Sequence, residues 1–168
     1  MSRRVWVDRK FEMGLPVEAF HDVVERVRGT PARIEDRVRG LSRDQLVRRR
    51  GEAWSVQEHI GHLLDLEDLW DTRLDELMAG DSGLTGADMT NRRTHQANHN
   101  EREIGDLLAE FRAARQGIVD RLDAMSAGDR ERTAVHPRLD QPLSMTDLCF
   151  FVAEHDDHHL ASMTEALS

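Results

Sequence analysis

Apolar residues recur along this chain at intervals of three and four positions, which is the spacing of amphipathic helices. This pattern predicts four long helices, at about residues 17–41, 55–79, 88–125 (with residue 90 as the alternative start) and 144–167. No run of the sequence indicates a β-rich region, and no internal repeat is present. We therefore expect an all-α protein, a four-helix bundle formed by residues 1–168 as a single domain.

Residues that cap or interrupt helices mark the predicted ends. Ser55 and Glu58 form the S-x-x-E capping box of the second helix, and Ser144 caps the fourth. Pro31 lies inside the first helix, where its missing N–H predicts a kink or a short break. A longer irregular connection precedes the last helix. This connection contains Gly128, Pro137 and Pro142, residues that interrupt regular structure.

The charge balance and the lack of long apolar runs narrow the setting. The chain has 23 basic and 32 acidic residues, a net charge of −9, which argues against binding to the phosphate backbone of nucleic acids. No apolar stretch approaches the roughly 18 residues of a membrane span, and the N-terminal sequence lacks the apolar core of a secretory signal. Cys149 is the single cysteine, so no intrachain disulfide can form. We expect a cytoplasmic protein with no nucleic-acid or membrane partner.

Two histidines in the fourth helix carry the strongest chemical signal. His155 and His159 are one turn apart, within roughly 40° of each other on the apolar stripe of that helix. Imidazole is costly to bury unless its nitrogens find partners. A metal ion would satisfy both rings, as in helical H-x-x-x-H zinc sites. A hydrogen-bonded pair of core histidines is the alternative interpretation.

The second and third predicted helices offer candidates for a third ligand. His62 lies about 40° from Leu66 on the helical wheel and therefore points towards the bundle interior. His59 is one turn earlier and about 60° round. His95 and His99 make a second pair at the same spacing, but they lie more than about 90° from the apolar face of the third helix. We expect these two to face solvent or a cleft, and a second metal-binding pair is the alternative.

The remaining candidates have simpler interpretations. His21 and His136 are isolated in the sequence, which is typical of ordinary surface or capped histidines. His158 lies at the edge of the stripe and is expected to be exposed, with a substrate-facing or supporting role as the alternative. Glu58 is explained by its capping role, although it is also a conceivable general base.

Two sequence motifs resemble one known family. Residues 54–63, WSVQEHIGHL, resemble the W-s-x-x-e-x-x-x-H-l opening of the second helix in the DinB/YfiT-like family of damage-inducible proteins. Residues 155–161, HDDHHLA, resemble that family's closing H-d-x-x-H-l-x-q motif, with Ser162 in place of the usual Gln. The resemblance also extends to the N-terminal helix and to the connection at residues 136–137.

The resemblance implies a four-helix bundle with one divalent metal ion held by three histidines. At the matching positions these are His62, His155 and His159. Three imidazoles leave one coordination position open, which is typical of catalytic zinc. Zinc suits the ligands best, and nickel or iron also fits.

The family resemblance further implies the kind of chemistry. Family members of assigned activity resemble thiol-dependent S-transferases or isomerases, and others are described as metal-dependent hydrolases. We therefore expect an enzyme that activates water or a low-molecular-weight thiol against a small-molecule substrate. The alternative is a non-catalytic bundle whose structural metal serves binding or dimerisation.

Further sequence features bear on the mouth of such a site. The polar opening of the third helix, residues 91–100, either lines that mouth or is a solvated helix end. Trp54 and Trp70 are either cleft walls or core residues, and core packing is the simpler interpretation.

The sequence also bears on assembly. Apolar residues ahead of the first helix have no place in the bundle pattern, and exposing each large side chain costs about 1.5–3 kcal/mol. These residues are Trp6, Phe11, Met13 and Leu15. We expect this segment to lie across the bundle or a partner. We also expect a homodimer, because the family includes dimer-forming bundles and paired assembly is common.

Overall fold

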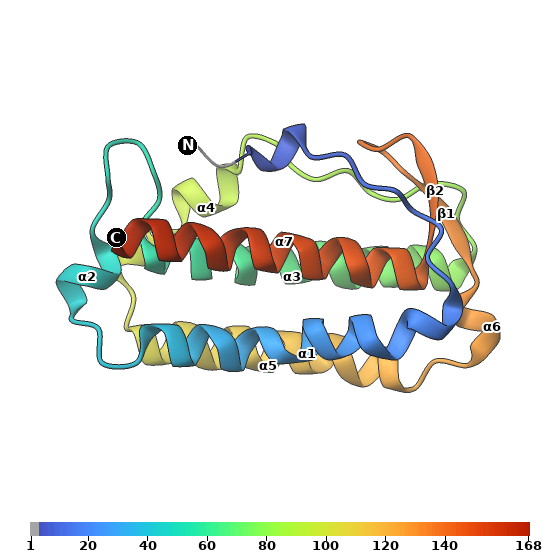
Figure 1. Cartoon of the computed structure of the whole chain (residues 1–168), viewed down its shortest axis with the longest axis horizontal. Helices are drawn as coiled ribbons and strands as arrows, with labels where there is room; N and C mark the ends of the chain where they lie inside the picture. The colour runs from blue at the N-terminus through green and yellow to red at the C-terminus, as the bar shows by residue number, and fades with distance from the viewer. Residues whose placement is uncertain (1–3) are drawn as a thin grey trace.

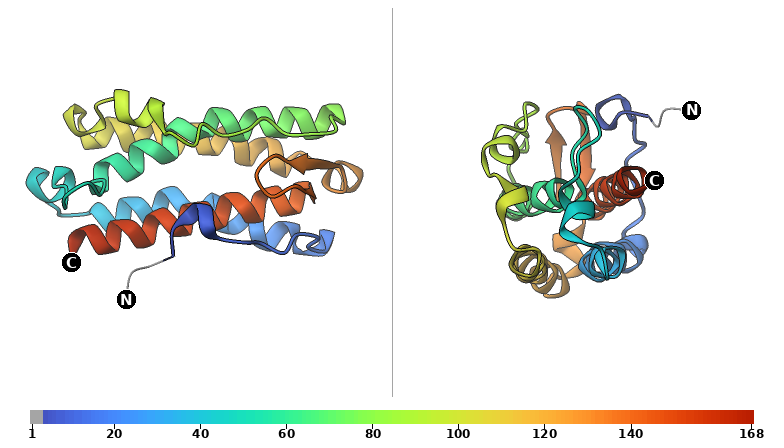
Figure 2. Two further views of the ribbon diagram at one scale, coloured as in Figure 1. Left: turned by 90° about the horizontal axis from the view of Figure 1, so that it is seen from above. Right: turned by 90° about the vertical axis from the view of Figure 1, so that its left-hand side faces the viewer.

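The computed structural model describes residues 4–168 and is a four-helix bundle with a small two-stranded sheet (Figure 1). Its long helices are α1 (Phe20–Val38), α3 (Val56–Ala79), α5 (Ile104–Asp123) and α7 (Met145–Leu167). Helices α1 and α3 each pack against both α5 and α7, so α1 and α3 occupy opposite corners of the bundle (Figure 2, right). Helices α1 and α7 run in one direction, and α3 and α5 run in the other (Figure 1). The predicted fold class is confirmed.

Short elements connect and cover these helices. They are η1 (Trp6–Asp8), η2 (Val17–Ala19), α2 (Arg43–Val47), α4 (Arg92–Gln96), η3 (His99–Glu101), α6 (Ala127–Arg130), β1 (Thr133–His136) and β2 (Gln141–Ser144).

The capping residues determine the ends of α3 and α7 as the sequence predicts. Ser55 accepts a hydrogen bond from the backbone N–H of Glu58, whose side chain accepts from Ser55 in return. Ser144 and Asp147 form the same box at the start of α7. Gly80 closes α3 in the left-handed conformation, with φ of 79°, which glycine adopts without steric cost.

Helix α1 continues through Pro31 without the predicted break. Proline has no N–H to donate, so it leaves the carbonyl of Val27, four residues earlier, without its helical partner. The guanidinium of Arg115 on α5 donates to that carbonyl at 3.1 Å. A side chain from a neighbouring helix thus replaces the lost hydrogen bond.

The third long helix begins at Ile104, and the predicted start at residue 88 or 90 is wrong. Asn91 and Asn98 adopt left-handed conformations, with φ of 52° and 51°, which interrupt a helix. Because α3 and α5 run in the same direction, the chain must return along the bundle between them (Figure 1). The polar segment after α3 makes this return, with only short helical turns in it.

The connection before α7 contains a β-hairpin, so the expectation of a wholly irregular connection is wrong. Strands β1 and β2 pair antiparallel, with Thr133 opposite Ser144 and His136 opposite Gln141. Asp140 occupies a left-handed position in the turn, with φ of 50°. The hairpin covers the end of the bundle where α3 ends and α7 begins (Figure 1).

The bundle interior consists of two apolar clusters separated by a buried polar layer. One cluster surrounds Phe20, Trp70 and Ile118, and the other surrounds Ile34, Leu63 and Phe111. Each long helix contributes one residue to the polar layer between them. These residues are Thr30, Glu67, Arg115 and Asp156, which are all at most 3% exposed.

The N-terminal segment lies along the bundle beside α7 (Figure 2, left). The Trp6 ring packs 5.3 Å from the ring of Phe11 and 5.2 Å from that of Phe151. Phe11 is buried, and Met13 and Leu15 pack against the same apolar cluster. Trp6, Phe11, Met13 and Leu15 are therefore covered, wholly or in part, within the chain, whereas Val5 and Val7 of the same segment are exposed.

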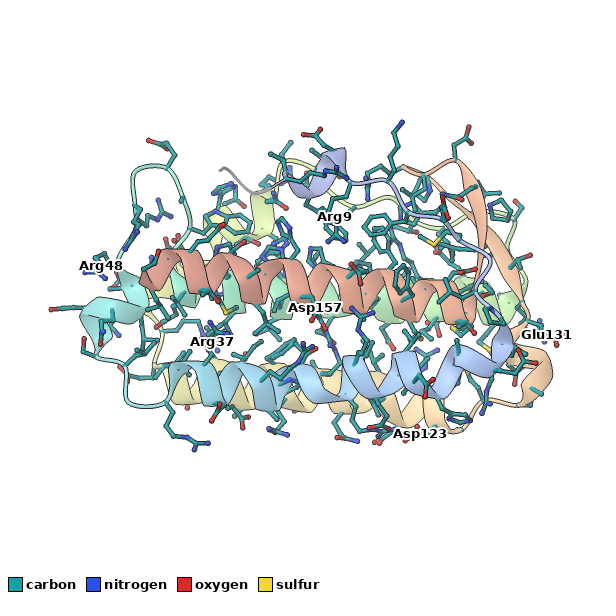
Figure 3. All side chains as sticks on the ribbon, in the orientation of Figure 1. Arg9, Arg37, Arg48, Asp123, Glu131 and Asp157 are labelled. Atoms are coloured by element: carbon teal, nitrogen blue, oxygen red, sulfur yellow. The ribbon has the colours of Figure 1, made fainter. Side chains whose placement is uncertain are left out.

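Charged side chains link α1 and α7 along the outside. Figure 3 shows Arg37 and Asp157 between the ribbons of these two helices. Asp157 pairs with Arg26 and with Arg33 at 2.5 Å each. Within residues 4–168, no helix combines the length and apolar character needed to cross a membrane.

Candidate metal centre

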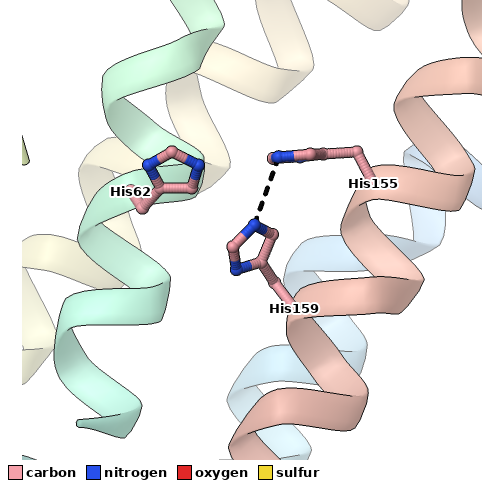
Figure 4. Close-up of side chains that lie close together, drawn as sticks. All are labelled: His62, His155 and His159. Atoms are coloured by element: carbon pink, nitrogen blue, oxygen red, sulfur yellow. Dashed lines mark hydrogen bonds between the residues drawn. The ribbon is translucent and has the colours of Figure 1, made fainter. Parts of the chain in front are cut away.

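Three histidines from two neighbouring helices converge on one point. His62 extends from α3, and His155 and His159 extend from α7, with their rings turned towards one another (Figure 4). One ring nitrogen of each lies within 4.8 Å of the other two. All three are at most 6% exposed. The structure therefore brings together the three positions that the sequence singled out.

The spacing of the nitrogens fits a metal ion. The Nε2 atoms of His155 and His159 are 3.2 Å apart (Figure 4). A tetrahedral ion at about 2.0–2.1 Å from each nitrogen would hold them roughly 3.3–3.4 Å apart. The ligand atom of His155 in this arrangement is Nε2, and its other ring nitrogen, Nδ1, is buried without a hydrogen-bond partner. Three neutral imidazoles are ligands that borderline metals such as zinc accept.

A hydrogen-bonded chain orients His62. Thr94 donates its hydroxyl hydrogen to the carboxylate of Asp65 at 2.8 Å. The Nδ1 of His62 lies 3.0 Å from the same hydroxyl oxygen, so Nδ1 must be the donor there. This leaves Nε2 of His62 without a hydrogen and available as a ligand. Such outer partners fix the tautomer and the ring orientation of metal-binding histidines.

His99 supports the same carboxylate from the other side. Its Nε2 donates to Asp65 at 2.9 Å, and its ring packs where a side chain on Gly61 would lie, 2.1 Å from a Cβ built there. Although burial opposes it, hydrogen bonds from His99 and Thr94 lower the pKa of Asp65. His99 is 3% exposed, so its expected solvent- or cleft-facing position is wrong, because the segment is not part of α5. His95 is exposed, as expected.

His59 orients His159. Their Nδ1 atoms lie 2.9 Å apart, which directs the other nitrogen of His159 towards His155. The sequence wheel placed His59 about 60° away from His62. His59 is nevertheless buried, because α7, which carries His159, packs against that side of α3.

Burial keeps the converging imidazoles neutral. Desolvation lowers the pKa of His62 to about 4. Desolvation also holds the pKa values of His155 and His159 well below their usual range. Neutral imidazole is the form that binds a metal, so no proton needs to leave these rings at pH 7.

The other histidines lie in different surroundings. His136 is 2% exposed, and its Nδ1 accepts hydrogen bonds from the backbone of Arg138 and Leu139 in the hairpin turn. The surface position considered for His136 is therefore wrong. His21 is exposed beside Arg130, and His158 is half-buried with its ring 5.6 Å from that of Trp6.

Glu58 is committed to the start of α3. Its carboxylate accepts from the backbone N–H of Ser55 and from the guanidinium of Arg49. Although burial opposes it, these hydrogen bonds lower the pKa of Glu58. The structure thus agrees with a capping role for Glu58.

A cavity of about 1380 Å³ lies over the three histidines. Helices α3 and α7 form its floor, and the N-terminal segment, the connection after α3 and the hairpin form its sides. Trp54 is half-buried in its wall, with its ring 4.8 Å from that of His62. Trp70 is buried and belongs to both the apolar core and the wall. Of the polar stretch 91–100, Asn91 lines the cavity.

Comparison with known proteins agrees with this architecture. The profile of the DinB superfamily matches residues 26–163. The fold is similar to that of YfiT from Bacillus subtilis, with a TM-score of 0.77 and 18% sequence identity over 94% of this chain and 91% of that one. That protein is described as a probable metal-dependent hydrolase with an unusual four-helix bundle topology. No curated protein matches this chain.

Proposed function

This chain belongs to the DinB superfamily, and from that premise we propose that it is a metal-dependent enzyme whose ion is held by His62, His155 and His159. The observation that carries the proposal is the convergence of these three buried imidazoles at the floor of a large cavity. A core histidine pair would need neither a third ring from another helix nor an opening beside it.

The number of ligands favours an open coordination position. Among residues 4–168, these three side chains are the one group of potential ligands that meets in this way. His59 contacts the far nitrogen of His159 and is therefore a supporting residue rather than a fourth ligand. Structural zinc sites are closed by four protein ligands, whereas catalytic sites keep one position free.

A divalent ion in such a site supplies a Lewis acid that lowers the pKa of a bound water or thiol towards neutrality. The protein's own residues hold and orient the ligands through Thr94, Asp65 and His59. The indole rings of Trp6 and Trp54 pack against His155 and His62 and form apolar walls beside the ligands.

We propose a reaction in which water or a low-molecular-weight thiol attacks a small electrophilic substrate. The cavity volume of about 1380 Å³ accommodates a small organic molecule together with such a nucleophile. The description of YfiT as a hydrolase supports the water-dependent reaction. Zinc is the ion we favour, since it accepts three imidazoles in tetrahedral geometry, and nickel or iron is also compatible.

The reaction can be tested with simple probes. The protein is stripped with a chelator, reloaded with zinc, nickel or ferrous ion, and assayed for hydrolysis of 4-nitrophenyl acetate and for conjugation of cysteine to 1-chloro-2,4-dinitrobenzene. We expect one activity to require the ion, to be lost in His155→Ala and to persist in His21→Ala, which changes an exposed histidine. If no loaded form exceeds the His155→Ala background with either probe, the proposed reaction is contradicted.

The alternative is that the metal is structural. Removal of the metal with a chelator distinguishes a structural role from a catalytic one. Two apolar clusters remain buried without any ion, so the bundle should keep its helical circular dichroism at 25 °C after chelation. Its melting temperature should fall, because a ligand that binds only the folded state stabilises it by mass action. Collapse to a random-coil spectrum on chelation would favour the structural metal.

We further propose that the protein forms a homodimer. Three exposed apolar side chains beside the cavity, Val5, Val7 and Met89, support a partner surface there. Sedimentation equilibrium at micromolar concentration should give twice the 19.3 kDa chain mass. Replacing the three with Ser should shift the distribution towards monomer. A single species at the chain mass for the unmodified protein would rule the dimer out.

A further inference from the structure

At the hairpin end of the cavity, a buried arginine faces a buried histidine. Arg73 of α3 is 1% exposed, and its Nε and Nη2 donate to the carbonyl of Thr85 at 3.0 and 2.8 Å. Its remaining terminal nitrogen, Nη1, lies 3.3 Å from Nε2 of His136. Both residues line the cavity.

The protonation of His136 means that Arg73 and His136 both present an N–H donor at this contact, and neither presents an acceptor. Its Nδ1 accepts backbone N–H groups from Arg138 and Leu139 at 3.2 and 3.3 Å, so the single hydrogen of the neutral ring is on Nε2. Burial and the charges of Arg73 and Arg138 lower the pKa of His136 to about 4, which keeps the ring neutral. The N–H groups of His136 and Arg73 therefore face each other without an acceptor. In the other tautomer the hydrogen is on Nδ1, where it would face the backbone N–H groups of Arg138 and Leu139 instead.

Arg138 adds a third donor that lacks an acceptor. Its Nη1 donates to the carbonyls of Val7 and Arg9 at 3.2 and 3.4 Å, whereas its Nη2 is buried without a partner. Neither Arg73 nor Arg138 forms an ion pair with a carboxylate in residues 4–168. Burial lowers the pKa of both guanidiniums, to about 10 for Arg73. One buried cation, Arg73, and one half-buried cation, Arg138, thus share one end of a cavity in a chain of net charge −9.

We propose that Arg73, His136 and Arg138 form a carboxylate-binding subsite, and that it holds the acidic end of the substrate while the reacting end lies at the three histidines. A carboxylate has no hydrogen to donate and accepts at both oxygens, so it supplies the missing acceptor and offsets one of the two positive charges. The assignment of the bound molecule as substrate rests on the proposed function, whereas the subsite itself does not.

The side chains around the subsite indicate the chemistry of the rest of the bound ligand. The Trp70 ring lies 5.3 Å from the Arg73 guanidinium carbon and 5.8 Å from the His155 ring, so one indole separates the subsite from the metal centre. The Phe151 ring lies 4.8 Å from that of His136. Aromatic walls between two polar ends favour a carboxylic acid with a short apolar or aromatic body.

The protein's own fluorescence offers the measurement. All three tryptophans of the chain line the cavity, so a ligand there should alter their emission. The probes are 4-phenylbutyrate, its neutral amide 4-phenylbutyramide, and inorganic phosphate. We expect 4-phenylbutyrate to bind at least about tenfold more tightly than the amide, since charge-assisted hydrogen bonds are the strong ones. Equal affinity for the two, or tighter binding of phosphate, would overturn the proposal.

Two variants test whether Arg73 and Arg138 cause the preference for the carboxylate over the amide. Arg73→Met and Arg138→Gln should each reduce the preference for the carboxylate to about twofold or less, as expected when a charged donor is lost. Arg50→Gln removes an exposed cation at the cavity mouth with the same change in net charge, and it should keep the preference. If Arg73→Met does not fold, the half-buried Arg138→Gln decides the matter. A full preference in Arg138→Gln would contradict the subsite.

The titration is repeated on metal-free protein and on His155→Ala. A preference that persists in both supports the subsite independently of the metal centre, even if the proposed metal function fails. A protein that binds its metal but shows no carboxylate preference would overturn the subsite and leave the metal function standing.

Discussion

Two polar clusters lie at the same level of the bundle, and they differ in how completely their groups are satisfied. In the interior, Arg115 pairs with Glu67 at 2.7 Å and with Asp156 at 2.5 Å. Asp156 also accepts from Thr30 at 2.6 Å, and Arg115 donates to the carbonyl of Val27. All four long helices contribute to this Arg115 cluster, and it needs no group from outside.

The histidine cluster is on the other side of α3 and α7, beneath the cavity. Next to Asp156 in the sequence, His155 has one nitrogen without a partner and the other facing a nitrogen of His159. Buried polar groups in native proteins are nearly always hydrogen-bonded, and an incomplete network calls for an explanation. The comparison teaches that a closed polar network indicates a structural role, whereas an incomplete one beside a cavity indicates a ligand.

Removing Arg115 should have the largest effect, because it breaks the closed cluster. Arg115→Met leaves Glu67 and Asp156 buried without their cation, and burial already raises the pKa of Glu67. We expect a loss of about 3–5 kcal/mol in the free energy of unfolding, as for other buried ion pairs that lose one partner. Urea denaturation followed by circular dichroism measures it.

The matched control is Arg112→Met, three residues earlier on α5, whose guanidinium pairs with Glu35 on the exposed side. Exposed pairs contribute less than about 1 kcal/mol. A loss of less than about 1 kcal/mol in the free energy of unfolding for Arg115→Met as well would show that the Arg115 cluster does not stabilise the bundle.

Thr94→Val tests the support of the histidine cluster. It removes the acceptor for Nδ1 of His62 and the link to Asp65, while keeping the shape of the side chain. We expect metal affinity to fall by about 10- to 100-fold, since outer partners of metal-binding histidines have effects of that size. Competition with a chromogenic chelator measures it. Thr90→Val, at an exposed position of the same connection, should leave the affinity unchanged.

The histidines should also make the metal-free protein sensitive to acid. The pKa values of His62 and His136 are lowered to about 4 from the ordinary 6.5, with burial as the largest cause. Between these values the unfolded chain binds protons that the folded chain does not, so the free energy of unfolding falls as pH falls from 6.5 towards 4. We expect each group to contribute on the order of 1–2 kcal/mol by pH 5.

Urea titrations of metal-free protein at pH 7 and pH 5 check this dependence. His136→Gln should reduce it, with His21→Gln as the control at an exposed position. An undiminished dependence in His136→Gln would contradict the role of that buried ring.

The regular elements and the histidines on them could be predicted from the sequence. Periodicity placed His155 and His159 on one stripe and His62 on the face of another helix, and the capping box fixed the start of α3. The supporting residues could not be found in this way. Thr94 and His99 approach Asp65 only because the connection after α3 returns along the bundle, which is a long-range contact.

The Arg115 cluster also has a signal in the sequence. Arg115 lies four residues after Phe111 and three before Ile118, on the apolar face of α5. A charged residue inside such a stripe indicates a buried ion pair. Its partners, Glu67 and Asp156, are likewise charged residues among the apolar positions of α3 and α7. Only the structure shows that the three side chains meet.

We propose that the incomplete histidine cluster holds a metal ion. Metal content measured by inductively coupled plasma mass spectrometry on purified single variants tests it most directly. We expect one divalent ion per chain in the unmodified protein, a loss of the ion in His62→Ala, His155→Ala and His159→Ala, and full content in His95→Ala. Full metal content in His62→Ala, with loss in His95→Ala, would contradict the account.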